Sequence, residues 1–163
     1  MMTHSGKLRN MSSVYIRSGN KLLLLYRQGN SIVQNLWIGS AGGHFEAAEY
    51  TDARACLLRE LKEELDLEES SLTDLSLRYI TLRYTNGELR QNYYFFARLS
   101  DNVVNTFSST EGILQWFDLA DVKLLDMPVT AAHVISHYID CGQFDQELYG
   151  AIVEQTDCKF VKL

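Results

Sequence analysis

The hydrophobic pattern of the first quarter of the chain predicts β-strands joined by short turns. Residues 13–28, SVYIRSGNKLLLLYRQ, form two apolar runs around Ser18-Gly19-Asn20, and glycine and asparagine accept the positive φ angles that hairpin turns need. A polar loop is expected next. Residues 36–45, LWIGSAGGHF, are expected to be extended, and their paired glycines allow the backbone to approach another group closely.

Helical periodicity follows an expected loop at residues 46–50. Thr51 or Asp52 is the expected N-cap of a helix that runs to about residue 65. The expected buried stripe of this helix consists of Leu58, Leu61 and Leu65. At about 100° per residue, a different face carries three carboxylates, those of Glu60, Glu63 and Glu64.

The second half of the chain is again rich in β-type residues. Residues 75–99 form two runs around Asn86-Gly87, which is the strongest short hairpin signal in the sequence, and residues 113–119 predict a further strand. Pro128 precedes a helical pattern that stops at Gly142. The tail from residue 147 is open to two interpretations, a final strand or a loose end. These elements predict an α/β (α+β) fold in which a mixed sheet carries a helix on either face.

Length and charge restrict the class of protein. The 163 residues, 46% hydrophobic and 22% charged, predict one domain over 1–163 with a core at about 12–140. The formal net charge of -6 argues against a stable nucleic-acid partner, which normally requires a basic face. A phosphate ligand is still compatible with this charge, because a divalent cation can reverse the local field.

The cysteines and the apolar runs favour a cytoplasmic protein without a membrane partner. Cys56, Cys141 and Cys158 are odd in number and lack metal-type spacing, so reduced thiols are expected. The apolar run 22–26 is much shorter than the roughly 18 residues of a membrane-spanning helix. The first 13 residues also lack the apolar core of a signal peptide.

The three glutamates of the first helix are unfavourable neighbours. Like charges at i, i+4 cost about 0.2–0.5 kcal/mol, and Arg59 and Lys62 provide only partial relief. One interpretation is a solvated acidic face. The other is a metal platform, because carboxylates beside the exposed backbone carbonyls of paired glycines supply the oxygen ligands that suit Mg²⁺ or Mn²⁺.

These residues resemble the Nudix hydrolases, whose box reads G-x5-E-x7-R-E-U-x-E-E-x-G-U, with U apolar. Residues 43–49 match its first part, and 59–64, RELKEE, match its helical part. Two departures are visible. Nine residues instead of seven separate Glu49 from Arg59, which bears on the role of Glu49, and Asp66 replaces a glycine. Aspartate tolerates the left-handed conformation, so it can still end the helix. The resemblance implies a sandwich of a mixed sheet between helices.

The resemblance also implies a set of site residues. The metal ligands would be Glu60, Glu63 and Glu64, helped by the carbonyl of Gly42 or Gly43, and Arg59 would orient a catalytic glutamate. The metals would neutralise a diphosphate and activate water. The proton acceptor would be Glu63 or Glu60, or Glu111 if its loop closes over the site.

Three further residues are candidates for substrate binding. Arg27 ends a strand at which the family often keeps a phosphate- or base-contacting arginine, whereas the alternative is a solvated strand end. Trp37 and Trp116 could stack on a nucleobase, although aromatic residues in strands usually belong to the core. Cys56 is interpreted as a packing residue.

The resulting hypothesis is a Mg²⁺-dependent Nudix pyrophosphohydrolase. Its first expected substrate is a nucleoside triphosphate, including oxidised forms such as 8-oxo-dGTP, which would yield the monophosphate and pyrophosphate. The alternatives are a dinucleotide or nucleotide-sugar pyrophosphatase and, from another class, a nucleotide-binding sensor that does not hydrolyse. The sequence leaves open whether the protein is a homodimer.

Overall fold

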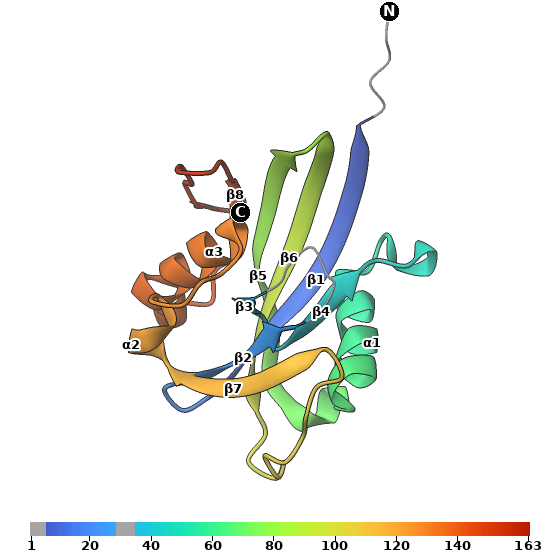
Figure 1. Cartoon of the computed structure of the whole chain (residues 1–163), viewed down its shortest axis with the longest axis vertical. Coiled ribbons are helices and arrows are strands. Elements are labelled where there is room, and N and C mark those ends of the chain that lie inside the picture. The colour runs from blue at the N-terminus through green and yellow to red at the C-terminus, as the bar shows by residue number, and fades with distance from the viewer. Residues whose placement is uncertain (1–5, 29–34) are drawn as a thin grey trace, which may run out of the picture.

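A mixed β-sheet forms the centre of the computed structural model, which describes residues 6–28 and 35–163 (Figure 1). Within these residues the strands are β1 Lys7–Ser18, β2 Lys21–Arg27, β3 Leu36–Ile38, β4 Ala41–His44, β5 Leu72–Thr85, β6 Glu88–Leu99, β7 Gly112–Asp118, β8 Tyr149–Ile152 and β9 Val161–Lys162. The main path runs β3-β2-β1-β6-β5-β8-β9, while β4 pairs with β1 and β7 with β2. The pairs β1–β6 and β5–β8 are parallel, and the other strand pairs are antiparallel.

Helices cover both faces of this sheet, which confirms the predicted fold class (Figure 1). The α-helices of the described residues are α1 Ala53–Leu65, α2 Leu119–Val122 and α3 Val129–Asp140. Short 3₁₀ helices lie at Ala47–Glu49, Glu69–Ser71 and Gly142–Phe144. None of the helices in the described ranges is long and apolar enough to cross a membrane.

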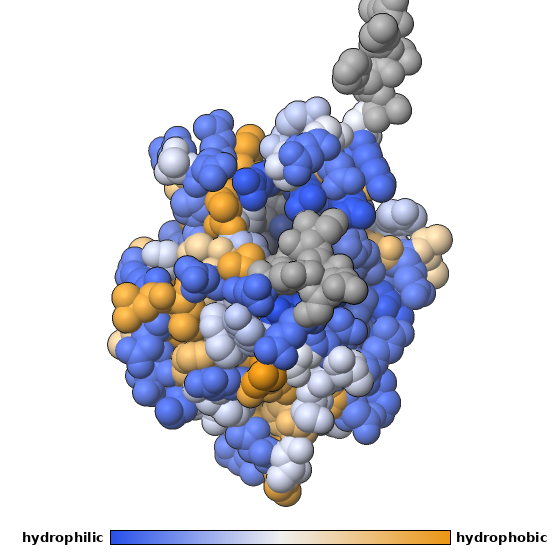
Figure 2. All heavy atoms as spheres, in the orientation of Figure 1, coloured by the Kyte–Doolittle hydropathy of each residue, from blue (hydrophilic) through white to orange (hydrophobic). Residues whose placement is uncertain are grey.

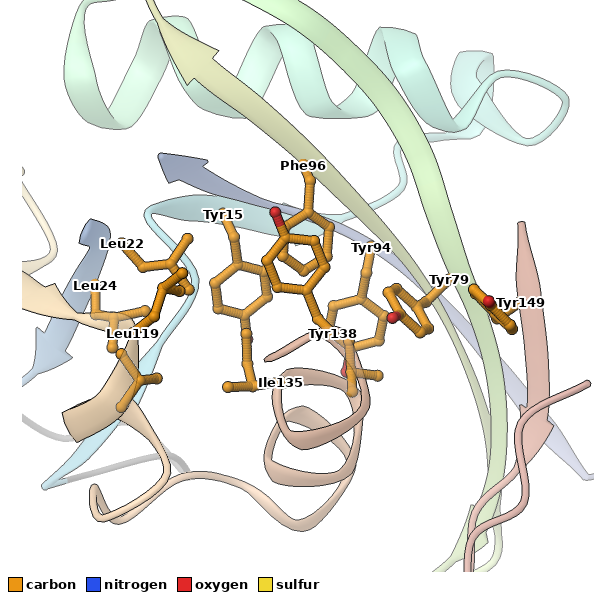
Figure 3. Close-up of a cluster of buried hydrophobic side chains, with 12 residues drawn as sticks. Tyr15, Leu22, Leu24, Tyr79, Tyr94, Phe96, Leu119, Ile135, Tyr138 and Tyr149 are labelled. Atoms are coloured by element: carbon orange, nitrogen blue, oxygen red, sulfur yellow. The ribbon is translucent and has the colours of Figure 1, made fainter. Parts of the chain in front are cut away.

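Alternation along the strands divides the core into two layers. On β1, Val14 and Ile16 pack in the cluster of α1, while Tyr15 between them belongs to the cluster of α3. The α3 layer is largely aromatic, and Phe96 stacks on Tyr138 of α3 with ring centroids 3.9 Å apart (Figure 3). Successive side chains of a strand point to opposite faces, so one long strand supplies both layers.

The first long helix agrees with its predicted ends. The Asp52 side chain accepts a hydrogen bond from the Ala55 N–H at 2.9 Å, as an N-cap does. At the other end Asp66 adopts the left-handed conformation with φ 53°, and its N–H bonds to carbonyls of the last turn. Aspartate therefore ends this helix where the family pattern has glycine.

The buried stripe of α1 differs from the prediction by one position. Leu57, Leu61 and Leu65 are buried, together with Cys56, whereas Leu58 is only partly buried. The buried residues follow i, i+4, i+8 spacing, and this row faces the sheet. Sequence alone could not distinguish Leu57 from its neighbour, because both are apolar.

Several strand boundaries also differ. β1 begins at Lys7 and β5 at Leu72, earlier than the apolar pattern indicates, because the paired backbones continue past the apolar side chains. The predicted segment 36–45 divides into β3 and β4, and the expected loop 46–50 contains a 3₁₀ turn. The tail forms β8 and β9, so the strand interpretation is confirmed. Most of the predicted polar loop, residues 29–34, lies outside the described residues.

The β5–β6 hairpin has the predicted two-residue turn. Asn86 and Gly87 have φ angles of 52° and 75°, the left-handed values that glycine and asparagine accept. The register places Thr85 opposite Glu88 and continues along both strands.

We expect Leu57→Ala to lower the free energy of unfolding by about 2–5 kcal/mol, because it leaves a cavity between α1 and the sheet. Leu58→Ala is the matched control and should cost less than half as much, since its side chain is partly in water. Urea denaturation of both variants measures the difference. Equal losses would contradict the observed orientation of α1.

Candidate active site

Arg59 holds together the carboxylates of the first helix. Its Nε and Nη2 donate to the two carboxylate oxygens of Glu49 at 2.7 and 3.1 Å. Its Nη1 donates to Glu60 at 2.8 Å and to Glu63 at 3.1 Å. A further bond from Nη2 reaches the carbonyl of His44 at 3.1 Å. One guanidinium thus connects α1, the 3₁₀ turn before it and the end of β4.

Glu49 reaches Arg59 despite the two-residue insertion. The insertion lies between the 3₁₀ turn Ala47–Glu49 and the N-cap of α1, where exposed Tyr50 and Thr51 absorb it. Glu49 is 7% exposed, and its carboxylate also accepts the Glu46 N–H at 2.8 Å. Its hydrogen bond to Arg59 lowers the pKa of Glu49 to about 2, against the opposing effect of burial.

Glu60 and Glu64 lie against the paired glycines of β4. Glu64 Oε2 accepts the Gly42 N–H at 3.2 Å. A Cβ at Gly43 would overlap the Glu60 carboxylate, and one at Gly42 would overlap the backbone of β1. The glycines are therefore required by close approach. The Gly43 carbonyl faces the Cys56 thiol, with Sγ 3.7 Å away.

The surroundings of Glu64 disfavour the charged form of its carboxylate. Burial, with smaller contributions from the charges of Glu60 and Glu111, raises the pKa of Glu64 to about 7, although the Gly42 N–H and Arg27 act in the opposite direction. A cation beside Glu64 would remove this penalty. The carboxylate oxygens around it suit a hard cation such as Mg²⁺, so the donor set fits the metal that the sequence implies.

The carboxylates are not already arranged as a closed metal cage. In the parts of the chain that the structure describes, no group of three or more His, Cys, Asp or Glu side chains is positioned to hold an ion. Glu63 is 57% exposed and is bonded to Arg59, as is Glu60, which is 13% exposed. Glu60 and Glu64 are therefore the carboxylates directed at β4, and Glu63 lies further out.

Arg27 and Glu111 form an ion pair beside Glu64. Their Nη2 and Oε2 atoms are 3.2 Å apart, and the β2–β7 register places Arg27 opposite Gly112. The loop before β7 is tied to α1, because the Thr110 N–H donates to the Glu64 carbonyl at 3.3 Å. The sequence candidates Arg27 and Glu111 thus lie together at the edge of the carboxylate group.

A cavity of about 170 Å³ opens next to these groups on the α3 face of the sheet. Gly42 and Arg27 line one end of it, and Arg83, Arg90 and Asn92 line another. The segment Pro128–Ala131 at the start of α3 contributes a wall. The volume is below the range of about 300–1,000 Å³ that is usual for ligand pockets, so it suits part of a ligand.

Sequence reasoning missed Arg83, Arg90 and Asn92. A signal was available in the hairpin RYTNGELR, whose two-residue turn places Arg83 directly opposite Arg90. Like charges in that position are unfavourable, as are the neighbouring glutamates of α1. Burial first, and then the charges of Arg9, Arg27 and Arg90, lower the pKa of His44, while Glu88 acts in the opposite direction.

The two tryptophans pack against the two layers of the core. Trp37 packs against Phe117 with ring centroids 4.6 Å apart and against Tyr26 at 4.9 Å. Trp116 packs on the core layer of α1. Neither tryptophan is among the described residues that line the cavity. Both are partly buried against the core, and stacking of either ring on a nucleobase stays a prediction.

Cys56 is a packing residue, as expected. Its side chain is fully buried on α1. Burial first and the charge of Glu49 second raise the pKa of the thiol to about 11, so the reactive thiolate is disfavoured.

Comparison with known proteins identifies the family of this chain. The family model described as NUDIX domain matches residues 7–138. Among curated protein sequences none matches significantly. Structural similarity is extensive, although the sequence identities below are low enough that it concerns the fold alone.

Three solved structures illustrate this similarity. The mutator MutT protein of Bacillus halodurans has a TM-score of 0.68 at 18% identity, covering 93% of this chain and 97% of that one. A C. elegans Ap4A hydrolase has a TM-score of 0.64 at 16% identity, with 84% and 99% covered. The NUDIX domain of Shewanella oneidensis NrtR, complexed with ADP ribose, has a TM-score of 0.58 at 15% identity, with 86% and 90% covered.

We expect Glu49→Gln to lower the free energy of unfolding by about 1.5–3 kcal/mol at pH 7, because it removes a buried charged hydrogen bond to Arg59. The ionised Glu49 gives its full stability above its ordinary pKa of 4.5, and this stability is lost as the pH falls toward 2. The gap between wild type and variant should therefore close over that window. Urea denaturation at pH 7 and pH 3 measures it. Glu63→Gln, whose side chain is exposed, is the control and should change stability by less than about 1 kcal/mol.

Proposed function

We propose that this chain, which belongs to the Nudix family of hydrolases acting on nucleoside diphosphate derivatives, uses Mg²⁺ to cleave a diphosphate linkage in a nucleotide. The first substrates to test are nucleoside triphosphates, including oxidised forms such as 8-oxo-dGTP, with the monophosphate and pyrophosphate as products. We expect the enzyme to be cytoplasmic.

One observation carries the proposal. Glu64 is held in a partly buried position beside Glu60 and Glu111, with too little positive charge to neutralise it. A fold does not gain stability from such an arrangement, because each buried carboxylate costs desolvation. A bound cation and the phosphate that follows it would supply the missing interactions.

The proposed roles follow from the positions of the side chains. Glu60 and Glu64, with Glu63 and the carbonyl of Gly42 or Gly43, would hold Mg²⁺; Mn²⁺ would fit the same oxygen donors. When bound, the metal would neutralise the diphosphate and lower the pKa of a bound water. Arg59 keeps the carboxylates of Glu60 and Glu63 oriented.

Three carboxylates remain candidates for the proton acceptor. Glu60 is partly buried and fixed by Arg59, and Glu63 is more exposed on the same guanidinium. Glu111 approaches from another loop and is paired with Arg27. Arg27 lines the cavity, so its guanidinium is available to a phosphate oxygen there.

A substrate panel tests the proposal directly. Wild-type protein is incubated with Mg²⁺ and with nucleoside triphosphates, oxidised nucleotides, dinucleoside polyphosphates or nucleotide sugars, and the products are identified by mass. We expect cleavage of a diphosphate linkage that stops when the metal is chelated. Binding of nucleotide without any cleavage would instead favour a sensor.

We expect Glu64→Gln to separate stability from activity. Because the pKa of Glu64 is raised in the folded state, the metal-free fold loses stability as the pH rises from 4.5 to about 7. Without metal, the variant should therefore be more stable than wild type by about 1–3 kcal/mol at pH 8, with the difference narrowing toward pH 5. It should nevertheless lose most activity and most of the melting-temperature gain with Mg²⁺.

The control for this variant is Glu68→Gln. Glu68 is 66% exposed and pairs with Lys62, away from β4, so this change should preserve both activity and the Mg²⁺ response. A Glu64→Gln enzyme with wild-type activity and metal dependence would remove Glu64 from the metal site.

A further inference from the structure

Three arginines lie in a row across neighbouring strands of the sheet. The β1–β6 register pairs Arg9 with Arg90, and the β5–β6 register pairs Arg83 with Arg90. Residues paired in this way point to the same face, about 5 Å apart from strand to strand. Arg90 and Tyr94 are four residues apart on β6, so their side chains lie on the same face of the sheet. Tyr94 belongs to the cluster of α3, so the row lies on the face that α3 covers.

The row has too little negative charge around it. Glu88 is shared by Arg9 and Arg90, at 3.5 and 3.4 Å, and by exposed Lys7. Arg83 makes no hydrogen bond or ion pair with any residue in the ranges 6–28 and 35–163. Like charges directly opposite one another destabilise a sheet, so the row itself contributes nothing favourable to folding.

Unpartnered polar atoms gather at the same place. The Nε of Arg90, the Oδ1 of Asn92 and the Oγ1 of Thr81 are buried and have no hydrogen-bond partner among the described residues. Asn92 and Thr81 are paired across the strands and lie on the face of Arg90, two residues along. Buried polar groups normally find partners, so the Nε of Arg90, a donor on a residue that lines the cavity, indicates a ligand with acceptor oxygens.

The arginines are connected to the carboxylates by the cavity. Arg83, Arg90 and Asn92 line the same space as Gly42 and Arg27. Gly42 of β4 is paired with Ser13 of β1, and Ser13 is paired with Tyr94 of β6. Arg90 is therefore two strands away from Gly42 and four residues away along the strand direction. This corresponds to about 13 Å along the strands and about 10 Å across them. Between these backbone positions the distance exceeds the span of one diphosphate, so the row lies beyond a diphosphate held at the carboxylates.

We propose that the substrate carries a second phosphate, remote from the cleaved diphosphate, and that Arg83 and Arg90 bind it at the far end of the cavity. The proposal rests on the proposed function and narrows its substrate class. A nucleoside triphosphate bound with its phosphates at the carboxylates has an uncharged base at its other end, which could accept hydrogen bonds from the arginines but would not neutralise their surplus charge. Guanidinium groups match phosphate oxygens with paired hydrogen bonds.

Two kinds of substrate present a phosphate in this way. One is a nucleotide whose ribose carries an additional phosphate, and the other is a dinucleoside polyphosphate whose chain continues beyond the cleaved linkage. The shared chemistry is a phosphate held apart from the reacting group. Figure 2 shows strongly hydrophilic surface, in the darkest blue, just above the grey segment and over β1, β5 and β6 as labelled in Figure 1.

Metal-free binding tests the arginines without requiring catalysis. Calorimetry compares AMP, adenosine 3′,5′-bisphosphate and diadenosine tetraphosphate on the wild-type protein. We expect one of the two phosphate-rich probes to bind about tenfold or more tightly than AMP, and which of them does so identifies the source of the phosphate. Equal affinity for all three probes would overturn the proposal, whatever the protein hydrolyses.

The variants Arg83→Gln and Arg83→Gln/Arg90→Gln complete the test. The double variant should lose the preference for the phosphate-rich probe and bind AMP as wild type does. The control is Arg98→Gln, because Arg98 is an exposed residue of β6 that pairs with Asp74. This control should retain the preference. Arg83→Gln should melt no lower than wild type, because it removes repulsion across the hairpin. Equal loss of affinity for AMP and for the preferred probe would overturn the proposal.

Failure of the proposed function gives a different result. If the wild type shows the phosphate preference but cleaves no member of the substrate panel with Mg²⁺, the arginine site stands and the hydrolase proposal falls. If it cleaves nucleotides but shows no preference, the hydrolase proposal stands and the arginine site falls.

Discussion

The guanidinium of Arg59 is the contact on which the arrangement of the site depends. It binds Glu49 with two hydrogen bonds, and it also reaches Glu60, Glu63 and the backbone of β4. Without it, the carboxylates of α1 and that of Glu49, just before the helix, would lie close together and repel one another. The same guanidinium leaves Glu64 outside its reach, so the surplus charge is concentrated at the carboxylate nearest Gly42.

Much of the fold follows from the sequence because local signals agree with one another. The helix caps at Asp52 and Asp66, the turn at Asn86-Gly87 and the apolar periods all specified elements that the structure contains. Boundaries were less accurate where pairing continues through polar residues, as at the start of β1. The buried stripe of α1 was displaced by one residue, because adjacent leucines do not reveal which of them faces the sheet.

The candidate site was only partly accessible from the sequence. A helix brings its own residues together, so the carboxylates could be grouped by spacing alone. Arg83 and Arg90 reach the cavity through strand register, which is a property of three chain segments aligned side by side. The surroundings of Trp37 and Trp116 were inaccessible for a similar reason, since the sequence predicts their strands but not the layer against which the rings pack.

The two-residue turn of the β5–β6 hairpin has a consequence for how such a protein can change by insertion and deletion. Because side chains alternate with a period of two, one residue added at Asn86-Gly87 must either bulge out or shift one strand, which would turn Arg83 toward α1. Two added residues would preserve the face but move the arginines out of line. The length of this turn therefore sets which charges meet across the strands, and lineages could alter ligand preference there without replacing a single cavity residue.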